Sequence, residues 1–158
     1  MRLLATGDRL STLIARLSLA VVMFPHGAQK ALGWFGGAGV GGTISGMQQT
    51  LGLPAWLTAL VIAAEFLGST ALLFGFLTRI AAFGIGCVMV GAIALVHGRH
   101  GFFLSGAPGE PPGFEYHLLA LGLVIVLLIE GGGKWSLDLA LWHRRMGAVV
   151  PIKKHRVA

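Results

Sequence analysis

The chain has 158 residues, of which 55% are hydrophobic and 11% charged, and its mean hydropathy is +0.80. Soluble domains carry about 25% charged residues, so the composition predicts an integral membrane protein of one domain rather than a soluble one. The formal charge of +6 does not indicate nucleic-acid binding, because the basic residues flank apolar stretches, as the positive-inside rule describes. The single cysteine, Cys87, excludes an intrachain disulfide and therefore a thiol oxidase that works through its own dithiol.

The first predicted transmembrane helix covers about residues 9–33 and contains Arg16, His26 and Lys30. We expect it to be retained, because no cleavage site typical of a signal peptide follows it. A charge at the middle of a bilayer costs about 2.5–3.5 kcal/mol, so these groups are expected to face other helices and to find partners there. His26 and Lys30 are four residues apart and share one helix face. The alternative is that Arg16 and Lys30 extend to the two membrane surfaces. Pro25 predicts a kink.

A glycine-rich stretch, residues 33–54, follows the first predicted span. Gly37, Gly39 and Gly42 match G-x-G-x-x-G, but no predicted strand precedes them, so we do not expect a dinucleotide site. Residues 43–51 are predicted to form a short helix that lies on the membrane surface.

Three more apolar stretches predict helices over about residues 56–77, 80–96 and 115–130. The only charge of the second span is Glu65, which lies about 14 Å along that helix. The third span is uncharged and ends at His97. The fourth has about 16 residues, slightly fewer than the 17–25 of a typical span.

The chain is predicted to end in an amphipathic helix that begins after Ser136, followed by a basic tail. We divide it into a transmembrane domain, residues 1–142, and a cytoplasmic tail, residues 143–158. The tail is expected to be attracted to anionic lipid, by about 1 kcal/mol for each basic residue.

Four spans place both termini on the same side of the membrane. Nine basic residues fall on that side and two, Lys30 and Arg99, on the other, so the positive-inside rule predicts that both termini are cytoplasmic. The predicted fold is therefore an all-α, four-helix transmembrane bundle, multi-pass in a plasma membrane of the bacterial inner-membrane type. The nine residues are Arg2, Arg9, Arg79, Lys134, Arg144, Arg145, Lys153, Lys154 and Arg156.

This topology gathers ionisable residues of all four spans in the outer half of one bundle. Ionisable groups inside a membrane mark functional sites by default, so we predict a polar pocket there. The ligand-binding candidates are Arg16, His26, Lys30 and His97, and the candidates for proton transfer in catalysis are Glu65, Glu115 and His117.

Structural interpretations of the same residues stay open. Glu65 can simply hold helices together, His97 can be an exposed residue at a helix end, and Glu115 can be an acid favoured by the helix dipole. Histidines from three helices can also ligate a metal or haem, but no close pair such as H-x-x-x-H is present, and we predict no metal site.

Several short motifs occur in a characteristic order. They are His26-Gly27-x-x-Lys30, Gly33-Trp34-Phe35-Gly36-Gly37, Gly52-Leu53-Pro54, Glu65, Gly75-x-x-Thr78-Arg79, Gly101-Phe102-Phe103, Glu115-Tyr116 and Gly133-x-x-Ser136-x-Asp138. Over about residues 9–142 the chain resembles the DoxX family of small four-helix membrane proteins. This family includes quinone-reducing thiosulfate dehydrogenase subunits and membrane partners of cytoplasmic redox proteins. The resemblance implies the fold more strongly than the reaction.

The expected function is that of a membrane subunit of a quinone-linked oxidoreductase, with a non-covalently bound quinone in the outer pocket. The chain has no strong flavin, haem or iron–sulfur motif, so electrons would come from a substrate or a cytoplasmic redox partner protein. The alternative is a non-catalytic scaffold that docks cytoplasmic redox or detoxification proteins. A carrier is disfavoured, because four helices are few and no inverted repeat is visible. Catalysis by the chain alone and homo-oligomerisation are left open.

Overall fold

The computed structural model of the chain describes residues 2–104 and 112–149, and every regular element within them is helical. Three helical segments, residues 10–32, 55–74 and 78–100, are long and apolar enough to cross a membrane. The elements are η1 (Arg2–Leu4), α1 (Leu10–Leu32), η2 (Trp34–Gly36), α2 (Gly39–Leu51), α3 (Ala55–Phe74), α4 (Thr78–Ala92), η3 (Ile93–His97), η4 (Gly98–His100), α5 (Glu115–Glu130) and α6 (Leu137–Val149).

The predicted all-α membrane fold is confirmed. α5 begins at Glu115 and ends at Glu130, as the sequence predicts, and its 16 residues make it shorter than the three long segments. α2 begins at Gly39, four residues before the predicted start of the surface helix. α3 ends at Phe74 because Gly75 has a φ of 64°, a left-handed conformation that glycine adopts without strain. The side of the membrane on which the termini lie stays a prediction.

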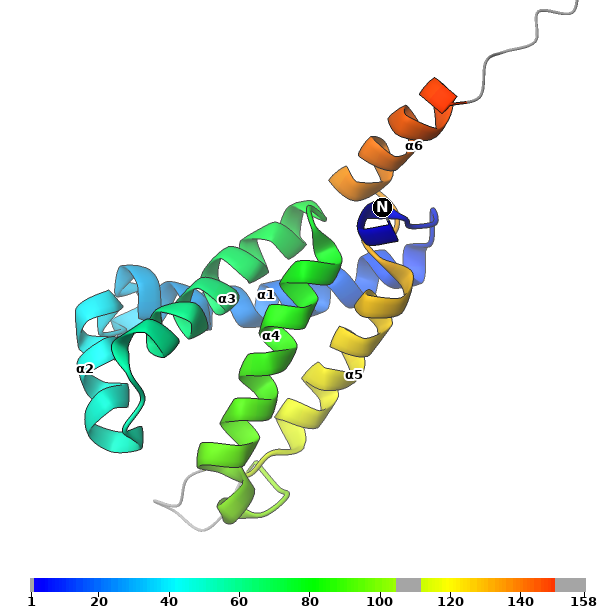
Figure 1. Ribbon diagram of the computed structural model, residues 1–158. Coiled ribbons are helices and arrows are strands. Elements are labelled where there is room, and N and C mark those ends of the chain that lie inside the picture. Colours follow the sequence, from blue (N-terminus) through cyan, green and yellow to red (C-terminus); the bar gives the residue numbers. More distant parts are fainter. Residues whose placement is uncertain (1, 105–111, 150–158) are drawn as a thin grey trace, which may run out of the picture.

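α1 and α3 form one antiparallel pair, and α4 and α5 form another. The two pairs diverge toward one end of the molecule (Figure 1). α1 packs against α3, and α4 packs against both α3 and α5. The start of the chain and α6 lie together at the end where the pairs converge, while α2 lies at the opposite end, beside α1 and α3. We call these the closed end and the open end.

The buried core holds the four helices together near the closed end. It contains mostly small and medium apolar side chains, so the helices approach closely. The core residues are Leu19, Ala20 and Met23 of α1, Leu72 of α3, Ala81, Ala82, Ile85 and Met89 of α4, and Ala120, Val124 and Leu127 of α5.

Arg16 ties two chain segments together at the closed end. Its side chain is 1% exposed. The guanidinium donates hydrogen bonds to the carbonyl oxygens of Leu72 (2.6 Å) and Leu73 (2.9 Å), at the end of α3. It also donates to the carbonyls of Lys134 (3.3 Å) and Trp135 (3.4 Å), after α5. Helix C-terminal carbonyls carry partial negative charge, so a buried cation is stabilised there.

The polar start of α6 completes the closed end. Ser136 Oγ accepts a hydrogen bond from the backbone N–H of Leu139 at 3.1 Å, which confirms the predicted cap. Asp138 is 1% exposed, and its carboxylate accepts hydrogen bonds from the N–H groups of Leu77 (2.8 Å) and Thr78 (2.9 Å). A side chain of α6 therefore caps the first turn of α4.

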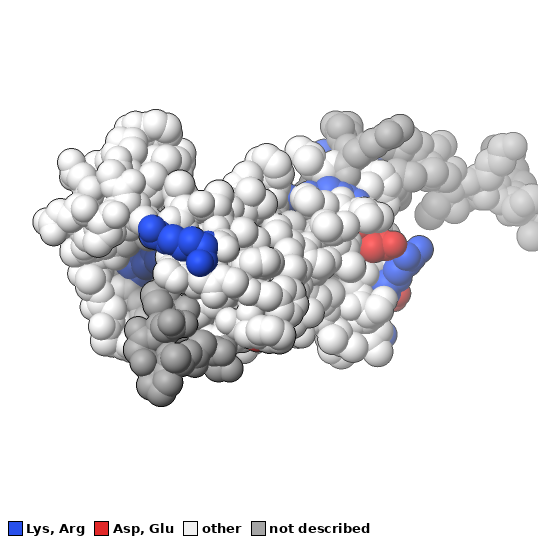
Figure 2. All heavy atoms as spheres, turned by 90° about the horizontal axis from the view of Figure 1, so that it is seen from below, with Lys and Arg blue, Asp and Glu red and all other residues white. Residues whose placement is uncertain are grey.

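The outer surface suits contact with lipid chains. Many large apolar side chains of α1, α3, α4 and α5 are exposed. On the face in Figure 2, charged side chains are few and gather in two places, with an uncharged surface between them. The basic tail residues Lys153, Lys154 and Arg156 lie outside the described residues.

Candidate functional site

A close approach of α1 and α3 positions the central ion pair. A Cβ added at Gly27 would lie 2.6 Å from the backbone of Phe66 and 2.7 Å from that of Glu65, so only glycine fits here. The rings of Phe24 and Phe66 pack against each other at 5.9 Å between centroids. Because Lys30 is one helical turn beyond Gly27, its side chain lies beside Glu65.

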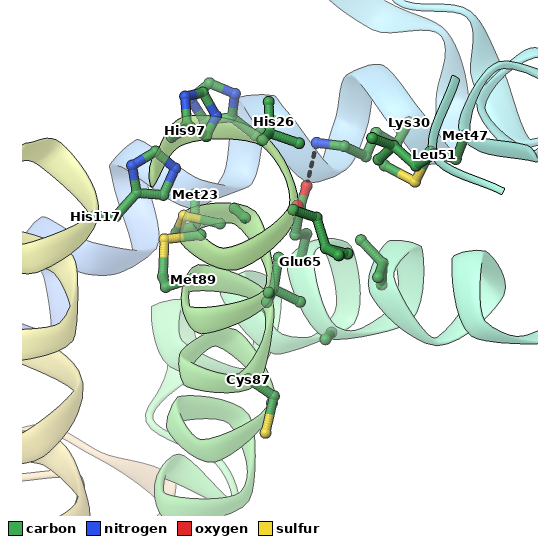
Figure 3. Close-up of a pocket in the computed structure, with 18 of the residues that line it drawn as sticks. Met23, His26, Lys30, Met47, Leu51, Glu65, Cys87, Met89, His97 and His117 are labelled. Atoms are coloured by element: carbon green, nitrogen blue, oxygen red, sulfur yellow. Dashed lines mark hydrogen bonds and ion pairs between the residues drawn. The ribbon is translucent and has the colours of Figure 1, made fainter. Parts of the chain in front are cut away.

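Lys30 Nζ lies 2.6 Å from Glu65 Oε2 (Figure 3). The Glu65 side chain is 5% exposed and that of Lys30 is 24% exposed. Lys30 is therefore the residue of α1 that pairs with Glu65. Arg16, which the sequence left as an alternative partner, binds carbonyl groups at the closed end instead.

A large pocket opens beside this ion pair, where the helix pairs diverge. Its volume is about 920 Å³, near the upper end of the range for small-molecule sites. Side chains of α1, α2, α3, α4, η3 and the start of α5 line it, and most are apolar. His26, Lys30, Glu65, His97 and His117 are among its polar residues. The structure thus brings together five of the seven residues that the sequence selected.

Two histidines form a second polar region of the pocket. The rings of His97 and His117 lie 4.3 Å apart between centroids. His97 Nδ1 lies 2.8 Å from the carbonyl oxygen of Pro112. Because a carbonyl only accepts, Nδ1 carries the proton and Nε2 is left for another partner. His117 is 7% exposed, and its buried Nδ1 has no hydrogen-bond partner among the residues that the structure describes.

The other two sequence candidates lie elsewhere. Arg16 is part of the closed end and does not line the pocket. Glu115 begins α5, and its Oε1 accepts a hydrogen bond from the N–H of Leu104 at 2.8 Å. It is not among the lining residues either. Their placement favours structural roles, whereas the roles of all seven residues in binding or catalysis stay predictions.

Part of the pocket wall is made of sulfur-containing side chains that the sequence did not predict there. Met23, Met47, Met89 and Cys87 line the pocket. The Tyr116 hydroxyl lies 3.4 Å from Met23 Sδ, within hydrogen-bonding distance. Methionine is common in apolar spans, so only the rotation of each helix in the assembled bundle shows which ones face a cavity.

The arrangement offers hydrogen-bond donors in an apolar cavity. Lys30 has three N–H donors, of which Glu65 takes one. His26 is exposed at the same wall. Within residues 2–104 and 112–149, no group of three or more His, Cys, Asp or Glu residues is placed to hold a metal ion. Such a site suits an apolar molecule that carries one or two hydrogen-bond acceptors.

The DoxX family model matches residues 11–98, which include all of α1 except its first residue, and the whole of α2, α3 and α4. The chain belongs to the DoxX family. Its 88 matched residues contain the Lys30–Glu65 pair and most of the pocket wall.

Two curated relatives match most of this DoxX chain. The inner membrane protein YqjF of Escherichia coli (strain K12) is 32% identical over 132 residues, which cover 83% of the chain and 92% of YqjF. The "Putative oxidoreductase CatD" of Bacillus subtilis (strain 168) is 27% identical over 118 residues, which cover 75% of the chain and 78% of CatD. No solved structure matches significantly. The expected localisation, multi-pass in a membrane of the bacterial inner-membrane type, agrees with YqjF and with the three long apolar segments.

Proposed function

We propose that this DoxX protein is the membrane subunit of an oxidoreductase and binds a quinone in the pocket at its open end. The observation that carries the proposal is the Lys30–Glu65 ion pair in the wall of an otherwise apolar cavity of about 920 Å³. A buried charged pair costs desolvation energy, so a membrane protein that only needed to hold α1 and α3 together could do so with apolar side chains. The name of the relative CatD supports the oxidoreductase class.

The lining residues fit a quinone by their chemistry. A bound quinone accepts two electrons, supplied by a substrate or by a redox partner protein, and two protons at its two carbonyl oxygens. The free N–H groups of Lys30 and the ring of His26 can donate to one oxygen. His97 Nε2 and His117 Nδ1 are ring nitrogens without a protein partner among the described residues. His117 Nδ1 can hold a proton for the other oxygen, whereas His97 Nε2 has to take up a second ring proton before it can donate one. Glu65 Oε2 keeps Lys30 in position by their 2.6 Å contact.

Binding of a quinone by the purified full chain tests the proposal. The chain is reconstituted in nanodiscs, and its affinity for a ubiquinone and for a menaquinone is measured. We expect His26→Ala and Lys30→Gln to weaken binding about tenfold, which corresponds to about 1.4 kcal/mol. Lys134→Gln is the matched control, because Lys134 lies after α5 at the closed end. It should bind like the unchanged protein.

Two results contradict quinone binding in this pocket. One is the lack of saturable binding of either quinone. The other is binding that His26→Ala and Lys30→Gln leave unchanged. If cytoplasmic redox proteins then co-purify with the chain from native membranes, the result favours the scaffold function instead.

A further inference from the structure

We propose that the ligand enters the pocket sideways from the bilayer, between α3 and α4, and that it is a quinone whose long apolar tail lies in this opening. The inference rests on the proposed function and adds the class of quinone and its route. The contact between α3 and α4 is closed at one level of the bundle and open at the next.

α3 and α4 touch at small residues toward the closed end. A Cβ added at Gly68 would be in ordinary contact with Ile85. One turn further, a Cβ at Gly84 would lie 3.4 Å from the Cβ of Ala64. Ala64 and Gly84 line the pocket, whereas Gly68 and Ile85 do not. The Ala64–Gly84 contact is therefore the edge of the pocket between these two helices.

Beyond this contact, the two helices separate and leave the pocket open. A Cβ added at Gly91, another lining residue, would meet nothing within 4 Å. Leu60 of α3 is 58% exposed, and Cys87 of α4 is exposed as well, although both line the pocket. Leu60 and Cys87 thus line the pocket and are exposed on the surface at the same time. At these two residues, no described part of the chain covers the cavity.

The opening lies at the depth of the lipid chains. Cys87 is nine residues after Thr78 and thirteen before His100, the two ends of the long helical segment. With a rise of 1.5 Å per residue it lies about 13 Å from one end, which is near the middle of a hydrocarbon core about 30 Å thick. Figure 3 shows Cys87 nearer the start of α4, away from the level at which the histidines and the ion pair lie. At this depth the surroundings are lipid chains, so an apolar ligand enters without crossing water.

The two regions of the pocket suit the two parts of a tailed quinone. The ring fits the polar region of Lys30, His26, His97 and His117, and the tail fits the apolar opening at Leu60 and Cys87. A ring alone would leave the opening to lipid chains. A tail gains free energy in transfer from water, but a tail that moves from lipid into the opening gains little, so its function is to guide the ring.

Photo-crosslinking shows directly where the tail lies. The probe is a benzoquinone with a decyl tail that carries a diazirine at its far end, added to the full chain in phosphatidylcholine nanodiscs. We expect adducts concentrated on residues 57–64 of α3 and on residues 83–95 of α4 and η3, and an excess of unlabelled decylquinone should reduce them about tenfold. The exposed face of α5, for example around Gly122, should carry only adducts that the competitor does not reduce.

Two glycine variants form a matched pair. Gly91→Phe places a ring in the open space of the pocket, whereas Gly122→Phe places one on an exposed face of α5 with nothing within 4 Å. Neither change meets a neighbouring atom at Cβ, so both should fold. Gly91→Phe should remove the competable adducts, and Gly122→Phe should retain them.

The remaining outcomes separate the failure of this inference from that of the proposed function. Two results overturn only the lateral route. One is a set of competable adducts elsewhere on the chain, and the other is the lack of competable adducts at the opening although decylquinone binds to the purified chain. The absence of competable adducts and of any quinone binding overturns both proposals. A diazirine phospholipid that labels Leu60 and Cys87, and that decylquinone does not displace, identifies a bound lipid and also overturns the inference.

Discussion

Glu65 has its carboxylate midway along a membrane-spanning helix and is 4% exposed. Such a group is stable in a bilayer only when another group compensates its charge. Lys30 does so at 2.6 Å. Arg16, the other buried base of α1, is compensated independently by carbonyl groups of α3 and of the segment after α5. The two cations of one helix therefore belong to two separate polar centres.

Double-mutant cycles distinguish these two centres. We expect Glu65→Gln and Lys30→Gln to be coupled by more than about 0.5 kcal/mol in the free energy of unfolding in detergent, because residues in contact are not additive. The cycle of Glu65→Gln with Arg16→Gln should be additive, because Arg16 contacts other groups. Coupling in the Arg16 cycle, or additivity in the Lys30 cycle, would show that the ion pair does not form in the membrane protein.

At the scale of elements, two contacts between helices decide the geometry of the site. Gly27 brings α1 against α3 at the level of Glu65. Asp138 of α6 caps α4, and Gly75 leaves room for Ser136, because an added Cβ would meet that side chain. The contact at Gly27 sets the distance between Lys30 and Glu65. The contacts of α6 fix the start of α4, and the helical segment that begins there leads to His97 at the pocket.

Gly27→Ala should separate α1 from α3. The added methyl would lie 2.6 Å from backbone atoms of Phe66, which cannot move as a side chain would. Overpacking of this kind costs about 1–3 kcal/mol, and we expect a lower thermal midpoint together with weaker quinone binding. In Gly122→Ala, the control, the methyl meets nothing within 4 Å, and replacing a helical glycine by alanine stabilises by about 0.5–1 kcal/mol. An unchanged midpoint for Gly27→Ala would contradict the close approach.

Asp138→Ala should loosen the start of α4. The loss of a cap costs about 0.5–2 kcal/mol, so the thermal midpoint should fall and amide hydrogen exchange should accelerate at residues 77–81. Asp8→Ala removes an exposed acid and serves as the control. If the two variants exchange equally at these amides, α6 does not cap α4.

At the scale of the whole molecule, α1, α3, α4 and α5 converge at the closed end, and the two helix pairs diverge at the open end (Figure 1). At the closed end, Arg16 and Asp138 satisfy backbone groups at helix ends, which is required wherever such ends lack water. At the open end, no equivalent contact joins α3 to α4 within the described residues, and the pocket occupies the space between them. One end thus maintains the fold, and the other is free to bind a ligand.

The orientation of the bundle in the membrane follows from its basic residues. The predicted topology assigns nine of them to the side of the two termini and two to the other side, so we expect the closed end, where the start of the chain lies, to face the cytoplasm. Reporters fused after residues 36, 78, 106 and 158 should read outside, inside, outside and inside. A cytoplasmic signal at residue 106 would contradict this topology and would place the pocket in the inner half of the membrane.

The sequence by itself determined the helices and most of the candidate residues. Apolar length predicted α1, α3 and the Thr78–His100 segment, and glycine and proline marked their ends. The cost of charge in a bilayer selected Lys30 and Glu65 as candidates, and it required that each find a partner inside the bundle. These requirements are local or energetic, so they can be recognised from the amino-acid sequence alone.

Only the tertiary structure decided which basic residue pairs with Glu65, which side chains line the pocket, and where it opens. Arg16 and Lys30 lie on the same helix, and the register of α1 against α3, set by Gly27, brings Lys30 rather than Arg16 to Glu65. Met23, Met89 and Cys87 face the cavity through the rotation of their helices. Register, rotation and the divergence of the helix pairs arise from packing between segments distant in sequence, and no periodicity within one segment encodes them.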